Sequence, residues 1–337
     1  MIRKCTHFSL LPYNTFGIDA SADVFVEYTS IEDLKKLLAD DTLPKPFLQI
    51  GGGSNLLFVS DFKGTAFHSA IKGMQVVEET DTEVYVRVGA GEVWDDFVAF
   101  AVDNGWCGAE NLSLIPGEVG ASAVQNIGAY GAEAKDLIDR VETVEVETGS
   151  ERVFTNVECQ FSYRKSIFKG ELKGKYVVTY VVYRLSKQMY YNLEYGNIRA
   201  ELEHCQDINL STIRQAIIHI RQTKLPDPKE QGNGGSFFMN PIIDRAQYEE
   251  LKKHYEDMPH YVVDEQHVKV PAAWMIDRCG WKGYVSGRVG VHDKQALVLV
   301  NRGGATGTEV VQLARSIQQS VLERFGISIY PEVNFIG

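Results

Sequence analysis

The segment Gly234-Gly235-Ser236-Phe237-Phe238 places one hydroxyl group between a pair of glycines and a pair of aromatic rings. Glycines open backbone conformations that other residues avoid and let a ligand approach the chain closely. The two rings could keep the hydroxyl dry, so that Ser236 could donate a proton to a reacting atom. An ordinary glycine turn with a solvated serine is the alternative, and the segment alone leaves both open.

Two more residues could carry charge-based chemistry. Arg164 lies among apolar neighbours after Tyr163, where it could aim a guanidinium at a carboxylate or be an ordinary surface residue. Glu332 follows Pro331 and has Tyr330, Val333 and Phe335 around it. An acid in apolar surroundings favours its neutral form, which can donate a hydrogen bond to an enolate. A solvated glutamate on an edge strand is the other reading.

Two glycine-rich stretches could hold a phosphate-bearing or flat ligand. The first, Gly51-Gly52-Gly53-Ser54-Asn55, offers consecutive backbone N–H groups. It is not a G-x-G-x-x-G dinucleotide motif, because Leu56 stands where the third glycine would be. The second runs from Ile115 to Gly131 and consists mostly of small residues. A tight turn and a closely packed loop are the alternatives.

The elements that would position these residues alternate between strands and helices, which predicts a mixed α+β chain. Alternation or short apolar runs predict strands at residues 47–50, 84–88, 144–147, 176–185 and 296–301. Apolar periodicity predicts helices after Ser30, from about 93 to 104, at 211–223 and at 308–325. Prolines and glycines crowd between 226 and 235, which indicates a domain boundary near residue 226.

Composition limits the function classes. The net charge of −11 argues against broad binding to nucleic acid or anionic membranes. We expect no membrane span and no signal peptide, because no apolar run has the required length. Five scattered cysteines without a Cys-x-x-Cys pair favour reduced thiols and a cytoplasmic location. The histidines are too scattered to predict a metal site.

Taken together and in order, these segments resemble the UDP-N-acetylenolpyruvoylglucosamine reductase (MurB) family. The resemblance covers nearly the whole chain, from Asn14-Thr15-Phe16-Gly17 through both glycine loops and Lys224-Leu225-Pro226-Asp227-Pro228 to Pro331-Glu332-Val333. It implies a vanillyl-alcohol-oxidase-like (PCMH-type) FAD-binding fold. It also implies FAD-binding subdomains at 1–69 and 70–225, the latter completed by 327–337, and a substrate-binding domain at 226–326.

The same resemblance assigns roles to individual residues. It implies that Ser236 protonates C2 of the enolpyruvyl group and that Arg164 and Glu332 stabilise the enolate formed after hydride reaches C3. Met239 departs from the family pattern, which has a basic residue before Asn-Pro, and one charge contact is thereby in doubt. The expected FAD contacts are Gly51, Gly52, Gly53, Ser54, Asn55, Pro116, Gly117, Gly120, Ala121, Ser122, Gln125, Asn126, Gly128, Ala129 and Tyr130. The expected substrate contacts are Tyr163, Tyr195, Lys224, Asn240, Tyr261 and Gln295.

The implied activity is NADPH-dependent, FAD-mediated reduction of UDP-N-acetylglucosamine enolpyruvate to UDP-N-acetylmuramate in peptidoglycan precursor synthesis. We expect a monomer with non-covalent FAD and a small nucleotide-sugar substrate. A flavin-linked alcohol oxidase of the same fold is one competitor, although such enzymes often tether FAD through a histidine near the first loop and the next histidine here is His68. A flavin- or nucleotide-binding protein without catalysis is another, against which the joint presence of Arg164, Ser236 and Glu332 argues.

Overall fold

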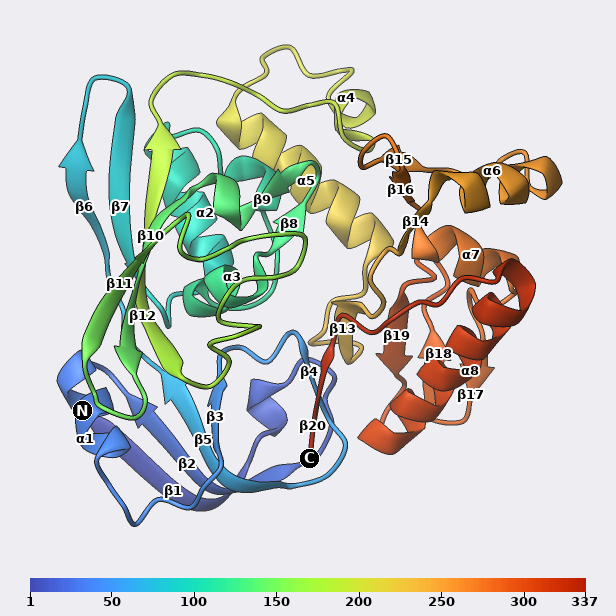
Figure 1. Cartoon of the computed structure of the whole chain (residues 1–337). Helices are drawn as coiled ribbons and strands as arrows, with labels where there is room; N and C mark the ends of the chain where they lie inside the picture. The colour runs from blue at the N-terminus through green and yellow to red at the C-terminus, as the bar shows by residue number, and fades with distance from the viewer. The chain divides into compact units, whose positions relative to one another are not determined.

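The computed structural model describes all 337 residues and divides the chain into two compact units (Figure 1). The first unit comprises 1–8, 21–53 and 62–223, and the second comprises 9–20, 54–61 and 224–337. The functional division at 69/70, 225/226 and 326/327 stays a prediction, because compactness alone does not define where a ligand binds. No helix combines the length and apolar character needed to cross a membrane.

The first unit contains two principal sheets. One has the order β1-β2-β5-β3, in which β2, β5 and β3 run parallel; its strands are β1 Ile2–Ser9, β2 Ser21–Tyr28, β5 Phe62–Ser69 and β3 Phe47–Ile50. The other is antiparallel with the order β11-β10-β12-β7-β6; its strands are β11 Glu151–Thr155, β10 Ile138–Glu145, β12 Tyr176–Ser186, β7 Glu83–Gly89 and β6 Met74–Glu79. A two-stranded ribbon pairs β8 Gly128–Ala129 with β9 Ala132–Glu133.

Helices complete the first unit. They are α1 Ile31–Leu38, α2 Trp94–Asp103, α3 Val119–Gln125, α4 Ile198–Glu201 and α5 Leu210–Lys224, with short 3-10 turns at Glu110–Leu112 and Ala134–Asp136. Ser30 caps α1 through its hydroxyl, which accepts a hydrogen bond from Asp33 N–H, as the sequence predicts. The main apolar core packs α2 and α3 against the antiparallel sheet (Figure 1). Phe97 stacks on Tyr183 within it, and Trp94 meets both rings at a steep angle.

The second unit has smaller sheets. One has the order β13-β19-β18-β17, with β13 Asn233–Ser236, β19 Val298–Asn301, β18 Val289–Val291 and β17 Val285–Ser286. Another has the order β14-β16-β15, with β14 Ile242–Asp244, β16 His267–Lys269 and β15 Tyr261–Val262. A third pairs β20 Asn334–Ile336 in parallel with β4 Leu56–Phe58. The helices are α6 Arg245–His254, α7 Ala272–Arg278 and α8 Gly307–Phe325, with a 3-10 turn at Leu11–Tyr13.

The α+β class predicted from the sequence is confirmed, and most predicted elements are present. Helix α8 begins at a capping box between Thr306 and Glu309 and ends at Gly326, whose φ of 64° is left-handed. The strand predicted at 144–147 is wrong in extent, since β10 covers Ile138–Glu145 and a turn follows it. Helix α3 was missed, because its glycine, alanine and serine residues have the composition of a loop.

Candidate active site

The two predicted glycine loops meet within the first unit. A Cβ placed on Gly52 would lie 3.4 Å from Cα of Gly117, and one placed on Gly51 would lie 3.1 Å from Oε2 of Glu118. The two loops approach this closely at positions where both carry glycine. Gly117 has a φ of 128°, a conformation that residues with side chains rarely adopt. The result is a backbone-lined cradle of the kind that accepts a diphosphate, so the residues present fit a bound FAD.

Several predicted FAD contacts in and after α3 also have packing roles. The hydroxyl of Ser122 donates to or accepts from the Tyr183 hydroxyl at 2.7 Å and bonds the Val119 carbonyl at 2.7 Å, deep in the core. A Cβ on Gly120 would lie 2.9 Å from Cβ of Ala90, so glycine is needed for α3 to pack there. Ala121 and Pro116 are exposed and remain accessible to a ligand.

Arg164 lies against the end of the second glycine loop. Its Nη2 donates to the Gly128 carbonyl at 2.6 Å and its Nη1 donates to the Asn126 carbonyl at 3.4 Å. Arg164 has a φ of 57°, and its guanidinium carbon lies 5.4 Å from the centre of the Tyr163 ring. Nearby, Lys169 Nζ donates to Gln125 Oε1 at 2.6 Å. The second glycine loop and Arg164 thus form one hydrogen-bonded assembly. Lys169 also belongs to it, although the sequence did not single this residue out.

The loop that carries Tyr195 packs on the same glycine-rich stretch. A Cβ on Gly131 would lie 3.2 Å from Cβ of Tyr195, and Asn192 Nδ2 donates to the Gly131 carbonyl at 3.2 Å. The Tyr130 and Asn192 carbonyls both accept from Asn111 Nδ2, at 2.9 and 2.8 Å. Asn111 is buried and holds the two segments together, a role that the sequence did not indicate.

Ser236 ends β13 in the second unit and is exposed, while Phe237 and Phe238 behind it are fully buried. Its strand rests on the Asn14-Thr15-Phe16-Gly17 turn. Thr15 Oγ1 donates to the Asn233 carbonyl at 2.6 Å, and a Cβ on Gly234 would lie 2.4 Å from the Phe16 ring. Gly234 therefore makes room for Phe16, whereas Gly235 adopts a left-handed φ of 67°, and Ser236 lies at the surface of the unit.

Asn301 reinforces this arrangement. Its Nδ2 donates to the carbonyls of Phe16 and Gly17 at 2.9 and 3.1 Å, and its N–H donates to the Gly232 carbonyl at 2.8 Å. The asparagine is buried at the end of β19 and joins the turn to the strand that carries Ser236. Only the tertiary structure brings these segments together, so the sequence contained no local signal for Asn301.

Backbone pairing brings Glu332 beside the serine segment. The Glu332 N–H donates to the Phe237 carbonyl at 2.8 Å, and the Met239 N–H donates to the Tyr330 carbonyl at 2.9 Å. On the other side, Asn55 Nδ2 donates to the Glu332 carbonyl at 3.3 Å. Glu332 is thus held from both sides through its main chain. Its partner Phe237 is the residue that follows Ser236.

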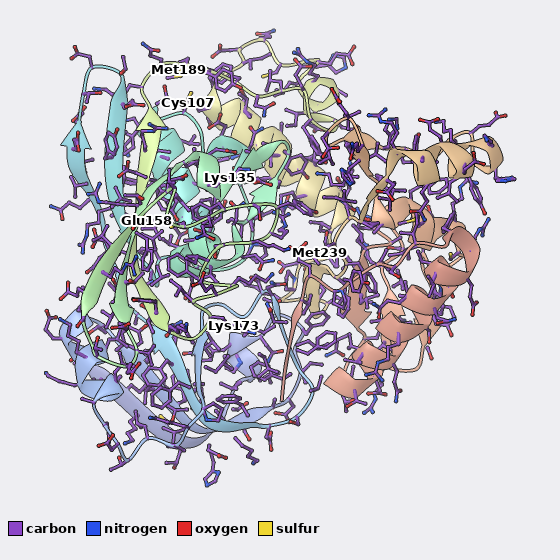
Figure 2. All side chains as sticks on the ribbon, in the orientation of Figure 1. Cys107, Lys135, Glu158, Lys173, Met189 and Met239 are labelled. Atoms are coloured by element: carbon purple, nitrogen blue, oxygen red, sulfur yellow. The ribbon has the colours of Figure 1, made fainter.

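The expectation that apolar neighbours enclose Glu332 is not met within this unit. Tyr330 is 61% exposed and Phe335 is 43% exposed, whereas Val333 is buried. Glu332 itself is only partly buried. Tyr330, Glu332 and Val333 precede strand β20 Asn334–Ile336, so apolar residues next to the glutamate in sequence need not enclose it. Met239, labelled in Figure 2, is half-buried on the paired segment.

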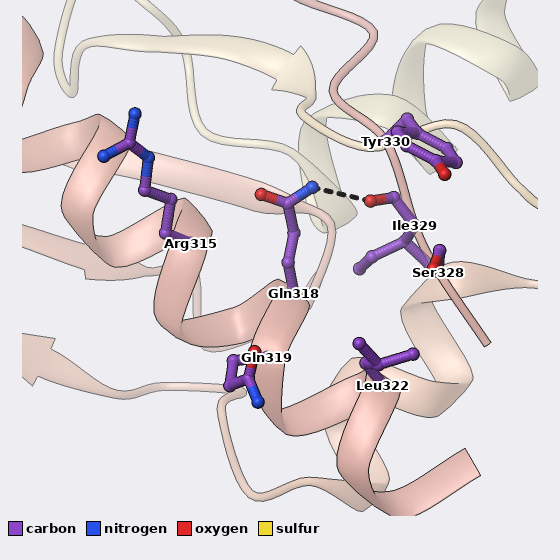
Figure 3. A pocket seen from close by; sticks show the side chains of 7 residues that line it. All are labelled: Arg315, Gln318, Gln319, Leu322, Ser328, Ile329 and Tyr330. Atoms are coloured by element: carbon purple, nitrogen blue, oxygen red, sulfur yellow. Dashed lines mark hydrogen bonds between the residues drawn. The ribbon is translucent and has the colours of Figure 1, made fainter. Parts of the chain in front are cut away.

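Helix α8 supports the segment that leads to Glu332. Gln318 Nε2 donates to the Ile329 carbonyl at 2.7 Å, as Figure 3 shows. Gln318 and Ile329 lie in a surface hollow of about 300 Å³, whose wall also includes Leu322 and the exposed ring of Tyr330. Gln318 therefore anchors the chain two residues before Pro331. No sequence motif indicated this contact.

The predicted substrate contacts of the second unit are placed by its small sheets. Asn240 accepts from the Ala272 N–H through Oδ1 at 2.9 Å, at the start of α7. In the β14-β16-β15 sheet, Ile242 and Tyr261 both pair with Lys269, whose Nζ lies 5.8 Å from the Tyr261 ring centre. The sequence did not identify Lys269, which the fold places beside Tyr261.

The other two predicted substrate contacts lie apart from this sheet. Lys224 is exposed at the end of α5. Gln295 lies in the turn before β19 and accepts from Leu297 N–H through Oε1 at 3.3 Å. The assignment of these residues to a substrate stays a prediction.

Comparison with known families first defines the class. Residues 22–155, which include both glycine loops, match the FAD-binding domain family. Residues 227–336 match the family described as UDP-N-acetylenolpyruvoylglucosamine reductase, C-terminal domain. An FAD-binding region of this type, together with a specialised C-terminal domain, defines a flavin-dependent oxidoreductase.

Full-length relatives identify the family. The chain is 58% identical over 329 residues to the UDP-N-acetylenolpyruvoylglucosamine reductase of Bacteroides fragilis (strain YCH46), covering 98% of this chain and 99% of that one. It is 47% identical over 334 residues to the protein of the same name from Flavobacterium johnsoniae, covering 98% and 99%. The chain belongs to the UDP-N-acetylenolpyruvoylglucosamine reductase (MurB) family, and the resemblance seen in the sequence is confirmed.

A solved structure supports the fold. The crystal structure of UDP-N-acetylenolpyruvylglucosamine reductase (MurB) from Thermus caldophilus matches with a TM-score of 0.70 at 21% sequence identity, covering 100% of this chain and 99% of that one. The PCMH-type FAD-binding region and the separate C-terminal domain predicted from the sequence are therefore confirmed as the fold of the chain.

Proposed function

We propose that the protein reduces the enolpyruvyl group of UDP-N-acetylglucosamine enolpyruvate to give UDP-N-acetylmuramate, a precursor of peptidoglycan, with NADPH as the reductant. The observation that carries this proposal is the match over 98% of the chain to relatives named for this reaction. The residues support it as well, since the chain has a proton donor, a guanidinium and a carboxyl group in the family's motifs.

Each proposed catalytic residue has a distinct task. When bound, FAD supplies the redox chemistry, taking two electrons from NADPH and passing them to the carbon–carbon double bond of the substrate. Negative charge then moves towards the substrate carboxylate, where the Arg164 guanidinium stabilises it with donors that are already oriented. The carboxyl group of Glu332, when protonated, would donate a second hydrogen bond to the same enolate. Ser236 donates its hydroxyl proton to C2, and because the enolate carbon is a strong base, a positioned hydroxyl suffices.

The structure supports these tasks within each unit. Arg164 is oriented by the carbonyls of the second glycine loop. Ser236 and Glu332 are brought together by the bond between Glu332 N–H and the Phe237 carbonyl, which fixes both through the main chain. Such preorganisation lowers the cost of reorienting groups as charge develops in the reaction.

The proposal also covers how FAD is held and where the enzyme works. FAD is held non-covalently by the two glycine loops, and the enzyme works in the cytoplasm as a monomer on a small nucleotide-sugar. Denaturing the holoenzyme and separating protein from small molecules tests whether the FAD is bound non-covalently. Flavin that remains with the denatured chain would instead support the competing class of covalently flavinylated oxidases.

Anaerobic spectroscopy tests the reaction itself. NADPH added to the holoenzyme without oxygen should bleach the flavin absorbance, and the enolpyruvyl nucleotide should then restore it with formation of UDP-N-acetylmuramate. A non-catalytic flavin-binding protein would show neither change. Bleaching by NADPH without recovery on adding the substrate would contradict the proposed substrate while leaving a flavin reductase in place.

A further inference from the structure

A buried histidine is held between two carboxylates beneath the glycine loops of the first unit. His68 lies on β5, where it pairs across the parallel sheet with Glu27 on β2 and with Ile50 on β3. Its Nδ1 lies 2.9 Å from Glu27 Oε2, and its Nε2 lies 2.9 Å from Glu118 Oε1. The His68 side chain is only 11% exposed.

The geometry indicates which protonation state this histidine has. Ionised carboxylates only accept hydrogen bonds, and a neutral imidazole has a single N–H donor. Both 2.9 Å contacts are therefore hydrogen bonds only when His68 is an imidazolium. Burial would lower the pKa of His68, but the hydrogen bonds and charges of Glu118 and Glu27 outweigh burial and raise it above its ordinary value.

The cluster lies directly against the cofactor cradle. Glu118 belongs to the second glycine loop, and its Oε2 would lie 3.1 Å from a Cβ on Gly51, the first residue of the other loop. His68 pairs with Ile50, which immediately precedes Gly51. A carboxylate at this place would repel the diphosphate of a nucleotide cofactor unless a cation neutralised it. Burial makes the repulsion stronger, because water screens it less.

We propose that His68 is a positioning residue of the FAD site, which as an imidazolium anchors and neutralises Glu118 so that the two glycine loops can accept an anionic diphosphate. The proposal rests on the proposed flavoenzyme function and adds a residue to it. His68, Glu27 and Glu118 are not among the expected FAD contacts or the three proposed catalytic residues.

The aromatic and cationic groups around the cluster keep their charge state near neutral pH. Tyr28, next to Glu27 on β2, faces Glu118, and burial raises the pKa of its hydroxyl away from neutrality. The Phe25 ring stacks on the His68 ring at 6.3 Å, and the Arg3 guanidinium from β1 lies 5.8 Å from the Phe25 ring centre. The arginine keeps its charge throughout the accessible range of pH.

The sign of the pH effect follows from the two states. With the imidazolium, the cluster carries one negative charge, from two carboxylates and one cation. Loss of the proton leaves two negative charges and breaks one of the two hydrogen bonds. Because the pKa of His68 is raised, the anchored state is present below the ordinary histidine pKa and is lost as pH rises through the shifted value. FAD affinity should fall over that range.

The test measures the FAD dissociation constant of the apoprotein by flavin fluorescence between about pH 6 and pH 9. His68→Gln should weaken FAD binding by about tenfold or more near pH 6 and should lose the fall at higher pH, since a bond to a charged group is removed. Glu118→Gln should bind FAD within a few fold of wild type near pH 6 and should keep that affinity at higher pH, because it needs no counter-charge. The double variant should bind FAD more tightly than His68→Gln alone.

His219→Gln is the matched control, because His219 also lies near a glutamate, Glu201 at 3.6 Å, but its side chain is 61% exposed. It should behave as wild type. The proposal is overturned if His68→Gln matches wild type across the pH range, or if the double variant binds FAD no better than His68→Gln. If His68→Gln does not fold, Glu118→Gln decides alone, and a wild-type fall of affinity that persists in it overturns the proposal. Wild-type protein that binds no FAD at any pH would refute the proposed function itself, and this inference with it.

Discussion

Replacing Arg214 with methionine should loosen the entrance to the second glycine loop. Arg214 on α5 makes two bonds to Asp95 on α2, from Nη1 to Oδ1 at 2.6 Å and from Nη2 to Oδ2 at 3.0 Å. The same Oδ1 accepts the Leu114 N–H at 2.6 Å, just before the loop begins. Leu114 has a φ of 57°, so this junction depends on outside support to keep an uncommon backbone conformation.

The magnitude follows from burial. The Asp95 and Arg214 side chains are 23% and 13% exposed, so the pair is mostly but not fully removed from water. Breaking a fully buried pair by removing one partner costs about 3–5 kcal/mol. Partial exposure reduces that figure, and we expect Arg214→Met to lower the free energy of unfolding by about 2–3 kcal/mol near neutral pH.

The effect should depend on pH with a defined sign. Burial would raise the pKa of Asp95, but the hydrogen bonds from Arg214 and the Leu114 N–H, with the charge of Arg214, lower it overall. A carboxyl group with a lowered pKa stabilises the fold above its unfolded pKa, about 4, and that contribution is lost as pH falls through the folded value. The difference between wild type and Arg214→Met should therefore shrink in acid.

Urea denaturation at several pH values measures this effect, and FAD affinity measures its consequence at the loop. Arg199→Met is the control, because the Arg199–Glu194 pair is exposed to water and should contribute little to stability. Asp95→Asn should cost less than Arg214→Met, since the amide oxygen can still accept from Leu114. Equal stabilities of Arg214→Met and Arg199→Met, or a difference that stays constant down to about pH 3, would refute the reasoning.

Four further outcomes are expected. Ser236→Ala should leave flavin reduction by NADPH intact and slow substrate reduction by about 10²- to 10⁴-fold in single-turnover kinetics, whereas equal slowing of both steps would indicate a structural serine. Glu332→Gln should keep far more substrate reduction than Glu332→Ala, because the amide still donates a hydrogen bond; equally inactive variants would mean that the residue acts through its charge. Gly117→Ala should weaken FAD binding by about tenfold or more, since its φ of 128° strains any side chain, and full flavin occupancy would contradict this. Gln318→Leu should cost about 1–2 kcal/mol of stability and lower kcat for substrate reduction, whereas Gln319→Leu, one residue along the same helix, should do neither.

Local patterns in the sequence were enough for several regular elements, among them β3, β7, β12, α5 and α8, whereas β1, β2 and β5 were not predicted. Ser30 caps α1 and Gly326 ends α8 because capping depends on residues within one or two turns of the helix end. The pleated strands followed from alternation for the same reason. Helix α3 was not recognised, because its helical conformation is held by packing of Gly120 on Ala90 and by the buried Ser122–Tyr183 bond, both of which are tertiary.

Some features of the site could likewise be predicted from local sequence, whereas others depend on tertiary contacts. The residue types of the glycine loops and of the Ser236 segment indicated a cradle and a proton donor. The residues that support them lie far away in the sequence: Asn301 bonds to Phe16 and Gly17, and Asn111 joins Tyr130 to Asn192. The sequence alone does not distinguish either asparagine from any other. The role of each depends on which carbonyls the fold places within reach of its amide.

The pairing of the Ser236 and Glu332 segments shows why sequence motifs could suggest these two residues as candidates while their placement could not be predicted. No side-chain contact between the two is needed to hold them, because the bond between Glu332 N–H and the Phe237 carbonyl and that between Met239 N–H and the Tyr330 carbonyl belong to the main chain. Main-chain bonds survive most substitutions of the side chains that they carry. Replacing Ser236 or Glu332 should therefore change the chemistry offered to the substrate while leaving the local backbone in place, and kinetic effects of these variants can be read as losses of proton donation or charge stabilisation.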